Sequence, residues 1–280
     1  MDARPDARRQ GAALTDAGDD AAPVVEARGV AKTFRDGTAA LAPVDLVVRA
    51  GEFVTLLGPS GCGKTTLLNM IAGLVAPSAG VMRWWGTAVA PTQVGQRRVG
   101  YVFQSPTLMP WTSVERNVRL PLDLEHRSSR EAARATADVL ALVGLDRFAR
   151  HLPRELSGGM QMRASIARAL VTEPPLLLMD EPFGALDEFT RQRLDDELLA
   201  LWRLKATTIV FVTHSIAEAV YLSTRIVVVG ARPGRIVDEF GIDPERPRGS
   251  DWRASPAFGE LSRRITASVD AAGLATLDER

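Results

Sequence analysis

The chain has a single cysteine, no excess of charge of either sign and no hydrophobic run long enough to cross a bilayer. One cysteine, Cys62, excludes a disulfide within the chain and fits a reducing compartment. Lys plus Arg and Asp plus Glu both number 34, and the formal net charge of zero argues against a nucleic-acid binder, which usually carries a basic excess. The longest apolar runs, PPLLLM and TIVFV, have the size of buried strands, not the ~18–20 residues of a membrane span. Work at a membrane would therefore need a partner that crosses it.

The beginning of the sequence lacks large apolar side chains. It reads MDARPDARRQGAALTDAGDDAAP, mixes both charge signs and has no apolar segment of the kind found in a secretory signal. Residues 1–22 cannot bury enough surface to offset the entropy of ordering them, so a disordered tail is expected. An electrostatic interaction arm is the alternative.

From Val24 onward the sequence alternates between β-like and helical patterns. Turn-bounded apolar runs predict strands in VVEARGVAKTF, DLVVRAGEFVTLLG, RRVGYVFQ, PLLLMDEP and ATTIVFVTH. The spacing of apolar residues predicts helices in KTTLLNMIAGL and EFTRQRLDDELLALWRLK. STRIVVVGARPGRIVDEF is typical of a terminal pair of β-strands. Strands that alternate with helices predict an α/β core with a mostly parallel sheet.

The stretch from about 105 to 164 contains no clear strand and predicts a helical insertion. Its prolines, Pro106, Pro110 and Pro121, are expected to break the regular pattern. A polar, Ala-rich helix should then run from about Ser129 to Val143, and a further helix from LSGGM to about Leu170.

The end of the chain, residues 241–280, has mixed charges and is expected to form a small packing extension, with a regulatory role as the alternative. A short helix behind an N-cap at Ser255 would place four apolar side chains on one face: Phe258, Leu261, Ile265 and Val269. The expected α/β core then covers residues 23–240.

A phosphate-binding loop is expected where the segment GPSGCGKT matches the pattern G-x-x-x-x-G-K-[ST]. The glycines allow successive backbone N–H groups to point at one anion. Lys64 would reach the β- and γ-phosphates, and the Thr65 hydroxyl would bind Mg²⁺. The preceding strand and following helix are the context that this motif requires.

Cys62 lies inside this loop, where a small filler residue is the favoured interpretation. Because a helix N-terminus can lower a thiol pKa, inhibition by thiol reagents is a side prediction.

Polar residues follow three predicted strands. Asp180 and Glu181 end LLLMDE, where the first would hold Mg²⁺ and the second would act as general base on water. Gln104 ends VGYVFQ and would contact Mg²⁺ and the water, and His214 ends TIVFVTH within reach of the γ-phosphate. Ligands of open α/β sheets bind at the carboxyl ends of strands, so we expect these residues to converge on the phosphate loop.

The segment 156–163, LSGGMQMR, resembles a second anion-binding helix start. Together with GPSGCGKTT, YVFQ, LLLMDEP, ALD and VTH, it makes the chain similar to ATPase subunits of ABC transporters over about residues 24–230. The family resemblance implies an α/β fold, a P-loop NTPase (RecA-like) core with an antiparallel β portion and an inserted helical subdomain at about 105–164. It also implies ATP and Mg²⁺ as cofactors.

The same resemblance implies a site shared by two copies packed head to tail. Ser157, Gly158 and Gly159 would bind the ATP held by the other copy's phosphate loop, and Asp187 would cross the interface. Phe34 matches the aromatic residue that stacks on adenine, where the family more often has Tyr. The expected nucleotide-binding residues are then Phe34, Gly58, Pro59, Ser60, Gly61, Cys62, Gly63, Lys64, Thr65, Thr66, Ser157, Gly158, Gly159 and Asp187. This chain departs from the family at Ser215 and Met160, but no group proposed for the chemistry is missing.

The segments LMPWTSVERNV, EPFGALDEFTR, EAVYLSTRIVVV and ARPGRI resemble the importer branch for nitrate, sulfonates, taurine and related solutes. This branch implies a peripheral position on the cytoplasmic face of the membrane, permease partners, an indirectly coupled solute-binding protein and no nucleic acid. Trp111 would lie near the cleft for the membrane partner, or else in the core.

Two other functions compete with the importer. A soluble ABC ATPase acting on nucleic acid or ribosomes is disfavoured by the zero net charge and by the short distance between Gln104 and Leu156, which leaves no room for a long coiled coil. A P-loop kinase or GTPase would leave LSGGM without a role, and no N-K-x-D guanine motif is present.

Overall fold

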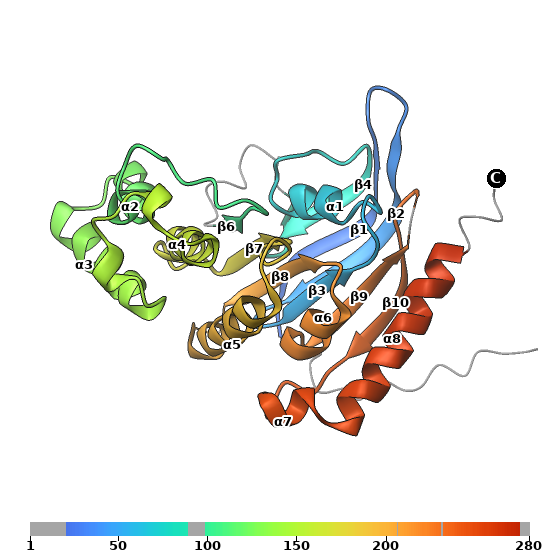
Figure 1. The fold of residues 1–280 in the computed structure, drawn as a ribbon. Helices are drawn as coiled ribbons and strands as arrows, with labels where there is room; N and C mark the ends of the chain where they lie inside the picture. The colour runs from blue at the N-terminus through green and yellow to red at the C-terminus, as the bar shows by residue number, and fades with distance from the viewer. Residues whose placement is uncertain (1–20, 89–98, 206, 231, 275–280) are drawn as a thin grey trace, which may run out of the picture.

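The computed structural model describes residues 21–88, 99–205, 207–230 and 232–274, and Figure 1 shows how they are arranged. The tail expected over residues 1–22 lies outside the described residues, except for Ala21 and Ala22. No helix among the described residues is long and apolar enough to span a bilayer.

A six-stranded sheet forms the centre of the molecule. Its order is β10-β9-β3-β8-β7-β6, and all neighbouring pairs are parallel except the last pair along the chain, β9 and β10. This confirms the mostly parallel core and the terminal β pair. The strands are β3 (Phe53–Leu57), β6 (Val99–Val102), β7 (Leu176–Asp180), β8 (Thr208–Thr213), β9 (Arg225–Gly230) and β10 (Arg235–Gly241). Because β3, β6, β7 and β8 run in one direction, their carboxyl ends meet at one edge.

A second, four-stranded antiparallel sheet has the order β2-β1-β4-β5. It contains β1 (Pro23–Thr33), β2 (Ala39–Arg49), β4 (Ala79–Trp84) and β5 (Thr87–Ala88). The sequence pattern predicted β1 and β2 but not β4 and β5. Only Met82 and Trp84 are buried in β4, so its alternation of apolar and polar residues is too short to be distinctive, and pairing with β1 supplies its stability.

Helix α1 (Lys64–Ile71) packs between the two sheets. Leu67 and Leu68 are fully buried in one cluster with side chains of β1, β2, β3, β8 and β9. The indole N–H of Trp84 in β4 donates to the Ile71 carbonyl at 2.9 Å, which ties the smaller sheet to the end of this helix. The helix that follows the phosphate loop is therefore held on both sides.

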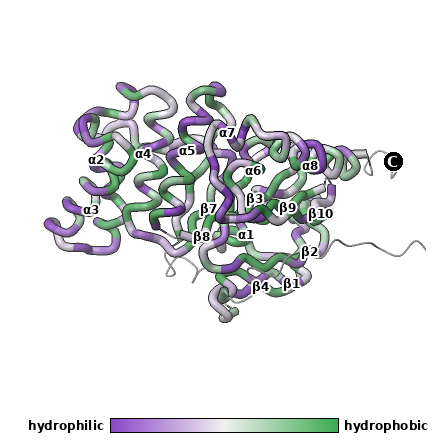
Figure 2. Tube along the Cα trace, turned by 90° about the horizontal axis from the view of Figure 1, so that it is seen from below, coloured by the Kyte–Doolittle hydropathy of each residue, from purple (hydrophilic) through white to green (hydrophobic). Residues whose placement is uncertain are grey.

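The other face of the large sheet is covered by α5 (Glu188–Lys205), α6 (Ile216–Leu222), α7 (Ser250–Arg253) and α8 (Pro256–Leu274). The predicted C-terminal helix and its N-cap are confirmed, because Ile265 is fully buried and the Ser255 hydroxyl accepts from the Phe258 N–H at 3.2 Å. The expectation that this helix is short is wrong, because α8 runs for 19 residues. In Figure 2 the hydrophobic colour gathers in the central strands and the hydrophilic colour on the outer turns.

Three helices beyond β6 and β7 pack around an apolar cluster of their own. They are α2 (Val114–Leu124), α3 (Ser129–Leu142) and α4 (Gly158–Leu170), with short 3₁₀ turns η2 (Asp146–Phe148) and η3 (Pro153–Glu155) between α3 and α4. The predictions of α3 and α4 are confirmed.

The expectation that Pro121 breaks regular structure is wrong, because α2 continues through it. Proline removes one backbone hydrogen bond, at a cost of ~3 kcal/mol inside a helix. Burial of Val114, Val118 and Leu122, at ~1.5–3 kcal/mol for each side chain, outweighs that loss.

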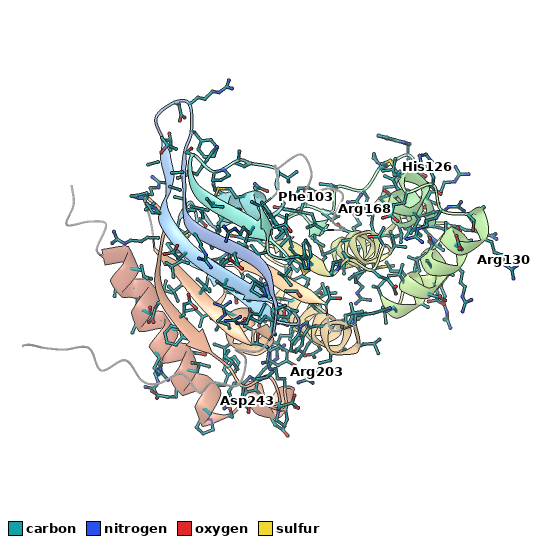
Figure 3. The ribbon with its side chains drawn as sticks, turned by 180° about the vertical axis from the view of Figure 1, so that it is seen from behind. Phe103, His126, Arg130, Arg168, Arg203 and Asp243 are labelled. Atoms are coloured by element: carbon teal, nitrogen blue, oxygen red, sulfur yellow. The ribbon has the colours of Figure 1, made fainter. Side chains whose placement is uncertain are left out.

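The segment after β6 is fixed to α4 by Arg168. Its guanidinium donates to the Pro106 carbonyl at 3.0 Å and to the Thr107 carbonyl and hydroxyl, both at 2.9 Å. Figure 3 labels Arg168 on α4 and Phe103, which directly precedes Gln104, after β6. The segment that follows Gln104 is therefore tied to the helical part by Arg168 as well as to the sheet by β6.

Candidate functional site

The phosphate loop, residues 58–66, joins β3 to α1 and requires its glycines. Gly61 and Gly63 have φ of 76° and 92°, a conformation that other residues rarely adopt. A Cβ on Gly58 would lie 2.2 Å from the Val229 carbonyl oxygen, and one on Gly63 would lie 2.6 Å from the Ala40 carbonyl oxygen. No side chain caps the start of α1, so its first N–H groups remain available to an anion.

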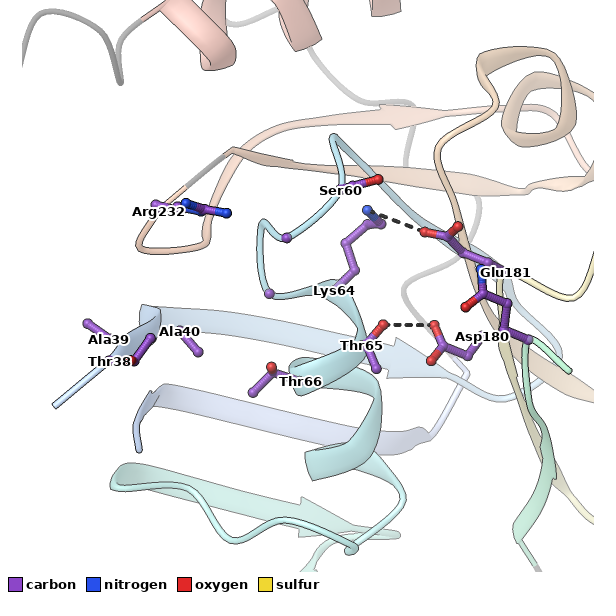
Figure 4. A pocket seen from close by; sticks show the side chains of 13 residues that line it. Thr38, Ala39, Ala40, Ser60, Lys64, Thr65, Thr66, Asp180, Glu181 and Arg232 are labelled. Carbon is purple, nitrogen blue, oxygen red and sulfur yellow. Dashed lines mark hydrogen bonds and ion pairs between the residues drawn. The ribbon is translucent and has the colours of Figure 1, made fainter. Parts of the chain in front are cut away.

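Lys64 is buried, with 4% of its surface exposed, and its ammonium lies within the curl of the loop. It donates to the carbonyls of Gly58 and Pro59, both at 2.8 Å, and its Nζ lies 3.8 Å from Glu181 Oε1. The amine is thus fixed between the loop and the end of β7 (Figure 4).

Asp180 ends β7 and accepts a 2.9 Å hydrogen bond from the Thr65 hydroxyl. Burial raises the pKa of the Asp180 carboxyl, while the Thr65 hydrogen bond opposes that rise. Gln104 lines the same pocket and offers an amide oxygen. A carboxylate, a hydroxyl and an amide oxygen are the hard donors that Mg²⁺ takes when substrate phosphates and water complete its shell, so these residues fit the ion.

Glu181 contacts both Lys64 and His214 at this edge of the sheet. Its Oε1 faces Lys64, and its Oε2 lies 3.0 Å from Nδ1 of His214, the residue after β8. Glu181 has a positive φ of 43°, held by a hydrogen bond from its N–H to the Val212 carbonyl at 3.0 Å. Residues other than glycine adopt this conformation at a cost, so the fold fixes where this carboxylate points.

These residues surround a pocket of about 660 Å³. Nine of the residues named from the sequence line it: Ser60, Gly61, Gly63, Lys64, Thr65, Thr66, Gln104, Asp180 and Glu181. His214 adjoins it through Glu181.

Four further lining residues were missed: Thr38, Ala39, Ala40 and Arg232. Ala39 and Ala40 begin β2, and Thr38 directly precedes it, shortly after Phe34; their small side chains carry no chemical signal. Arg232 belongs to the ARPGRI segment, between β9 and β10, and only the fold brings that turn to the pocket.

Cys62 does not line the pocket and is 1% exposed. Burial raises the pKa of its thiol, so the side prediction of a lowered pKa is wrong. The α1 N-terminus lies nearby, but the cost of placing a thiolate among apolar side chains is larger. The interpretation of Cys62 as a small packing residue agrees with this burial.

Phe34 is 42% exposed, with the Lys32 ammonium 5.3 Å from its ring centroid. It does not line the pocket, although Thr38 to Ala40 follow it closely. Trp111 is 78% exposed, so the interpretation of this side chain as part of the core is wrong and its interpretation as a surface residue remains.

The signature segment, residues 156–160, begins α4 at a distance from this pocket. Ser157 is the N-cap, and its hydroxyl accepts from the Met160 N–H at 3.3 Å. Within the described part of the chain, neither Ser157, Gly158, Gly159 nor Asp187 lines the pocket. Ser157, Gly158 and Asp187 are exposed, and a Cβ on Gly159 would lie 2.9 Å from Thr190 Cγ2. Ser157, Gly158 and Asp187 therefore lie on an exposed surface near the start of α5, with Gly159 buried beneath it, instead of joining the phosphate loop of their own chain.

Known proteins resemble the chain in both sequence and structure. Residues 41–184 match the family described as ABC transporter. A taurine import ATP-binding protein of Rhizobium johnstonii is 47% identical over 77% of this chain and 83% of its own length. An aliphatic sulfonates import ATP-binding protein of Bacillus licheniformis is 42% identical over 84% of this chain and 89% of its own.

The dimeric structure of the bacterial ABC transporter cassette MJ0796 superimposes with a TM-score of 0.70 at 35% identity, covering 78% of this chain and 99% of that one. A dimeric structure of the same cassette, described as a post-hydrolysis state bound to ADP and Pi, gives a TM-score of 0.69 with the same identity and coverage.

Proposed function

The chain belongs to the ABC transporter family and is an ATPase of that family, and we propose that it drives an importer of a small solute of the sulfonate, taurine or nitrate kind. The names of the taurine and aliphatic sulfonate relatives support the import direction and the solute class. The alternative of a soluble ATPase acting on nucleic acid or ribosomes has no such support.

The observation that carries ATP hydrolysis, the step proposed to drive import, is the contact of Glu181 with both Lys64 and His214, beside the pair of Thr65 and Asp180. Phosphoryl transfer requires cations at the phosphates and a base at the attacking water. Lys64 would bind the β- and γ-phosphates. Glu181 would accept the proton of the water, and His214 would orient that carboxylate from the neighbouring strand.

Thr65, Asp180 and Gln104 would hold Mg²⁺, which neutralises developing charge on the phosphates when it is bound. Phe34 would stack on the adenine. The loop backbone of Gly58, Pro59, Ser60, Gly61, Cys62 and Gly63, with Thr66, would complete the phosphate cradle. Proposed boundaries are 23–240 for the ATPase domain, with the helical subdomain at about 105–164, and 241–280 for a C-terminal extension.

Two copies would pack head to tail, so that Ser157, Gly158, Gly159 and Asp187 of one copy close on ATP held by the other. The exposure of this surface and the dimeric form of the MJ0796 cassette support that arrangement. ATP would stabilise the closed dimer, and hydrolysis would release it. The pair would sit on the cytoplasmic face of the membrane against permease subunits, with a solute-binding protein coupled indirectly.

The importer is tested by deleting the gene and measuring uptake of labelled taurine, an alkanesulfonate and nitrate. Uptake of at least one should fall to background, recover with the wild-type chain and stay low with Glu181→Gln. The tagged chain should also co-purify with an integral membrane protein. Unchanged uptake of all three solutes, with no membrane protein recovered from a chain that hydrolyses ATP, would contradict the importer.

A further inference from the structure

Arg232 enters the phosphate-loop pocket from the turn between β9 and β10. If Gly61 had a Cβ, that atom would lie 3.3 Å from Arg232 Nη2 and 3.9 Å from Nε, so the guanidinium rests against the middle of the phosphate loop. Figure 4 shows it on the opposite side of the loop from Glu181, directed inward. The pocket is therefore flanked by cations on two sides, Lys64 and Arg232.

The turn that carries Arg232 is held in place by backbone contacts. The Gly234 N–H donates to the Ala40 carbonyl at 3.1 Å, and the Gly234 carbonyl accepts from the Ala42 N–H at 2.8 Å. A Cβ on Gly234 would lie 2.1 Å from the Cys62 carbonyl oxygen, so the turn touches the phosphate loop closely enough to require glycine. Arg232 is thus positioned by both β2 and the loop itself.

Lys64 and Arg232 differ in the partners that their charged groups contact. Lys64 donates to two carbonyls and faces Glu181. Arg232, which is exposed, makes no hydrogen bond or ion pair with any residue in the part of the chain that the structure describes. The guanidinium donors therefore remain available to a ligand in the pocket.

The other charged residues that line the pocket are Asp180 and Glu181. The formal charges of Lys64, Arg232, Asp180 and Glu181 sum to zero, so the charged side chains of the lining contribute no net positive charge toward a polyphosphate. A guanidinium presents paired donors that match phosphate oxygens, and it stays charged at any physiological pH. Losing Arg232 would leave the lining with a net charge of minus one.

We propose that Arg232 binds the phosphates of the nucleotide held by its own chain, from the side of the loop opposite Glu181. This inference rests on the proposed nucleotide function of the pocket and adds a binding residue to it. Because Arg232 lies away from Glu181 and His214, it strengthens binding of ATP and ADP alike and takes no part in activating water.

The test measures ADP binding to the full-length chain by calorimetry, with Mg²⁺ present. Arg232→Met keeps an uncharged stem of similar length, and Arg232→Lys keeps the charge. Loss of a charge-assisted contact to phosphate should weaken ADP binding about 10–100-fold in the Met variant, and the Lys variant should recover most of it. Raising the salt concentration should reduce the difference in ADP affinity between the wild type and the Met variant.

Arg235→Met is the matched control, because Arg235 lies in the same hairpin but does not line the pocket. It should bind ADP within ~2-fold of the wild type, since no contact to the ligand is removed. Lys64→Ala separates the two proposals: if the wild type binds no ADP, or if this variant binds it normally, the pocket itself has been misassigned.

Three results would overturn the role of Arg232 while leaving the pocket intact. ADP affinity could be unchanged in Arg232→Met, or Arg232→Lys could be as weak as Arg232→Met. Alternatively, Arg232→Met could bind ADP normally as a monomer yet lose ATP-driven dimerisation, which would make Arg232 a contact across the dimer interface.

Discussion

Two helices of this protein begin with a glycine-rich sequence for which we propose anion binding, but their surroundings differ. Helix α1 begins at Gly63, without a side-chain cap, and its first residues lie in a pocket with Asp180 and Glu181. Helix α4 begins at Ser157, whose hydroxyl caps the helix itself, on an exposed surface. The start of α1 therefore lies beside one carboxylate proposed to bind a metal ion and one proposed to act as a base, both from its own chain. The start of α4 lies outside this pocket. In a pair of chains packed head to tail, the start of α4 in one chain would face the pocket at the start of α1 in the other.

The largest effect is expected from Glu181→Gln, which removes the base but keeps both helix starts. General-base catalysis contributes about 10²–10⁴-fold, so hydrolysis should fall by that order while ATP binding persists. Phosphate release measures the rate, and gel filtration with ATP should show an accumulated dimer holding two ATP. Glu188→Gln is the control, since Glu188 is an exposed surface partner of Arg191. Normal hydrolysis by Glu181→Gln would show that the base is another group.

Ser157→Arg breaks the second helix start alone and should abolish turnover while ADP affinity of the monomer stays at the wild-type value. Ser128→Arg is a matched control, because Ser128 caps α3 in the same way, accepting from the Glu131 N–H at 3.3 Å. Each such cap contributes about 1 kcal/mol to stability, so both variants bear the same structural cost. Full activity of Ser157→Arg would contradict the shared site.

A mixture of the Ser157→Arg and Lys64→Ala chains tests directly whether the two helix starts form one site across a dimer. A head-to-tail dimer of these two inactive chains contains one intact site, formed by the phosphate loop of the first and the signature segment of the second. Nucleotide trapping should therefore reach about one ATP per two chains, the stoichiometry expected from such a pairing of half-sites. If mixing restores no trapping under conditions where the wild type traps ATP, the two halves do not meet across a dimer.

The smallest effect concerns α5, on the face of the large sheet opposite α1. Asp195 in α5 is 1% exposed, and burial, with repulsion from Glu218, raises its pKa to about 8 despite Arg253 at 3.3 Å. Asp196 and Glu218 are the acidic groups that face it, and Arg253 of α7 is the cation.

Because the folded pKa of Asp195 exceeds the ordinary pKa of 3.8, the folded state binds more protons than the unfolded state between these two pH values. Stability should then fall as pH rises from about 4 to 8. Asp195→Asn should flatten this slope and raise Tm at pH 8, by about 2–4 °C for each kcal/mol recovered. Calorimetry at pH 6 and pH 8 measures the change in Tm between these values, with Asp138→Asn, at an exposed position, as the control. An unchanged slope would show that Asp195 stays ionised in the folded protein.

Much of the site could be named from the sequence because its residues are tied to local patterns. The phosphate loop needs glycines at fixed spacing, and Asp180, Glu181 and His214 each follow an apolar strand. Parallel strands carry such ends to one edge whatever the details of packing. The same reasoning found α3, α4, α5 and α8, whose apolar faces repeat with the helical period.

The features that the sequence did not predict depend on contacts between distant segments of the chain. Strands β4 and β5 gain their stability from pairing, Pro121 is tolerated because its neighbours are buried, and the thiol of Cys62 is governed by the apolar cluster around it. No local pattern contains these energies, since each comes from residues far away in the chain.

The sequence by itself determined the family, the sheet type and the chemical groups at the strand ends, because these follow from local spacing and from the direction of parallel strands. Only the tertiary structure decided that Glu181 contacts both Lys64 and His214, that Arg232 reaches the phosphate loop and that residues 157–159 face away from it. The physical reason is that these arrangements depend on contacts between segments far apart in the chain: the Val212 carbonyl of β8 holds Glu181, and β2 and the phosphate loop hold the β9–β10 turn.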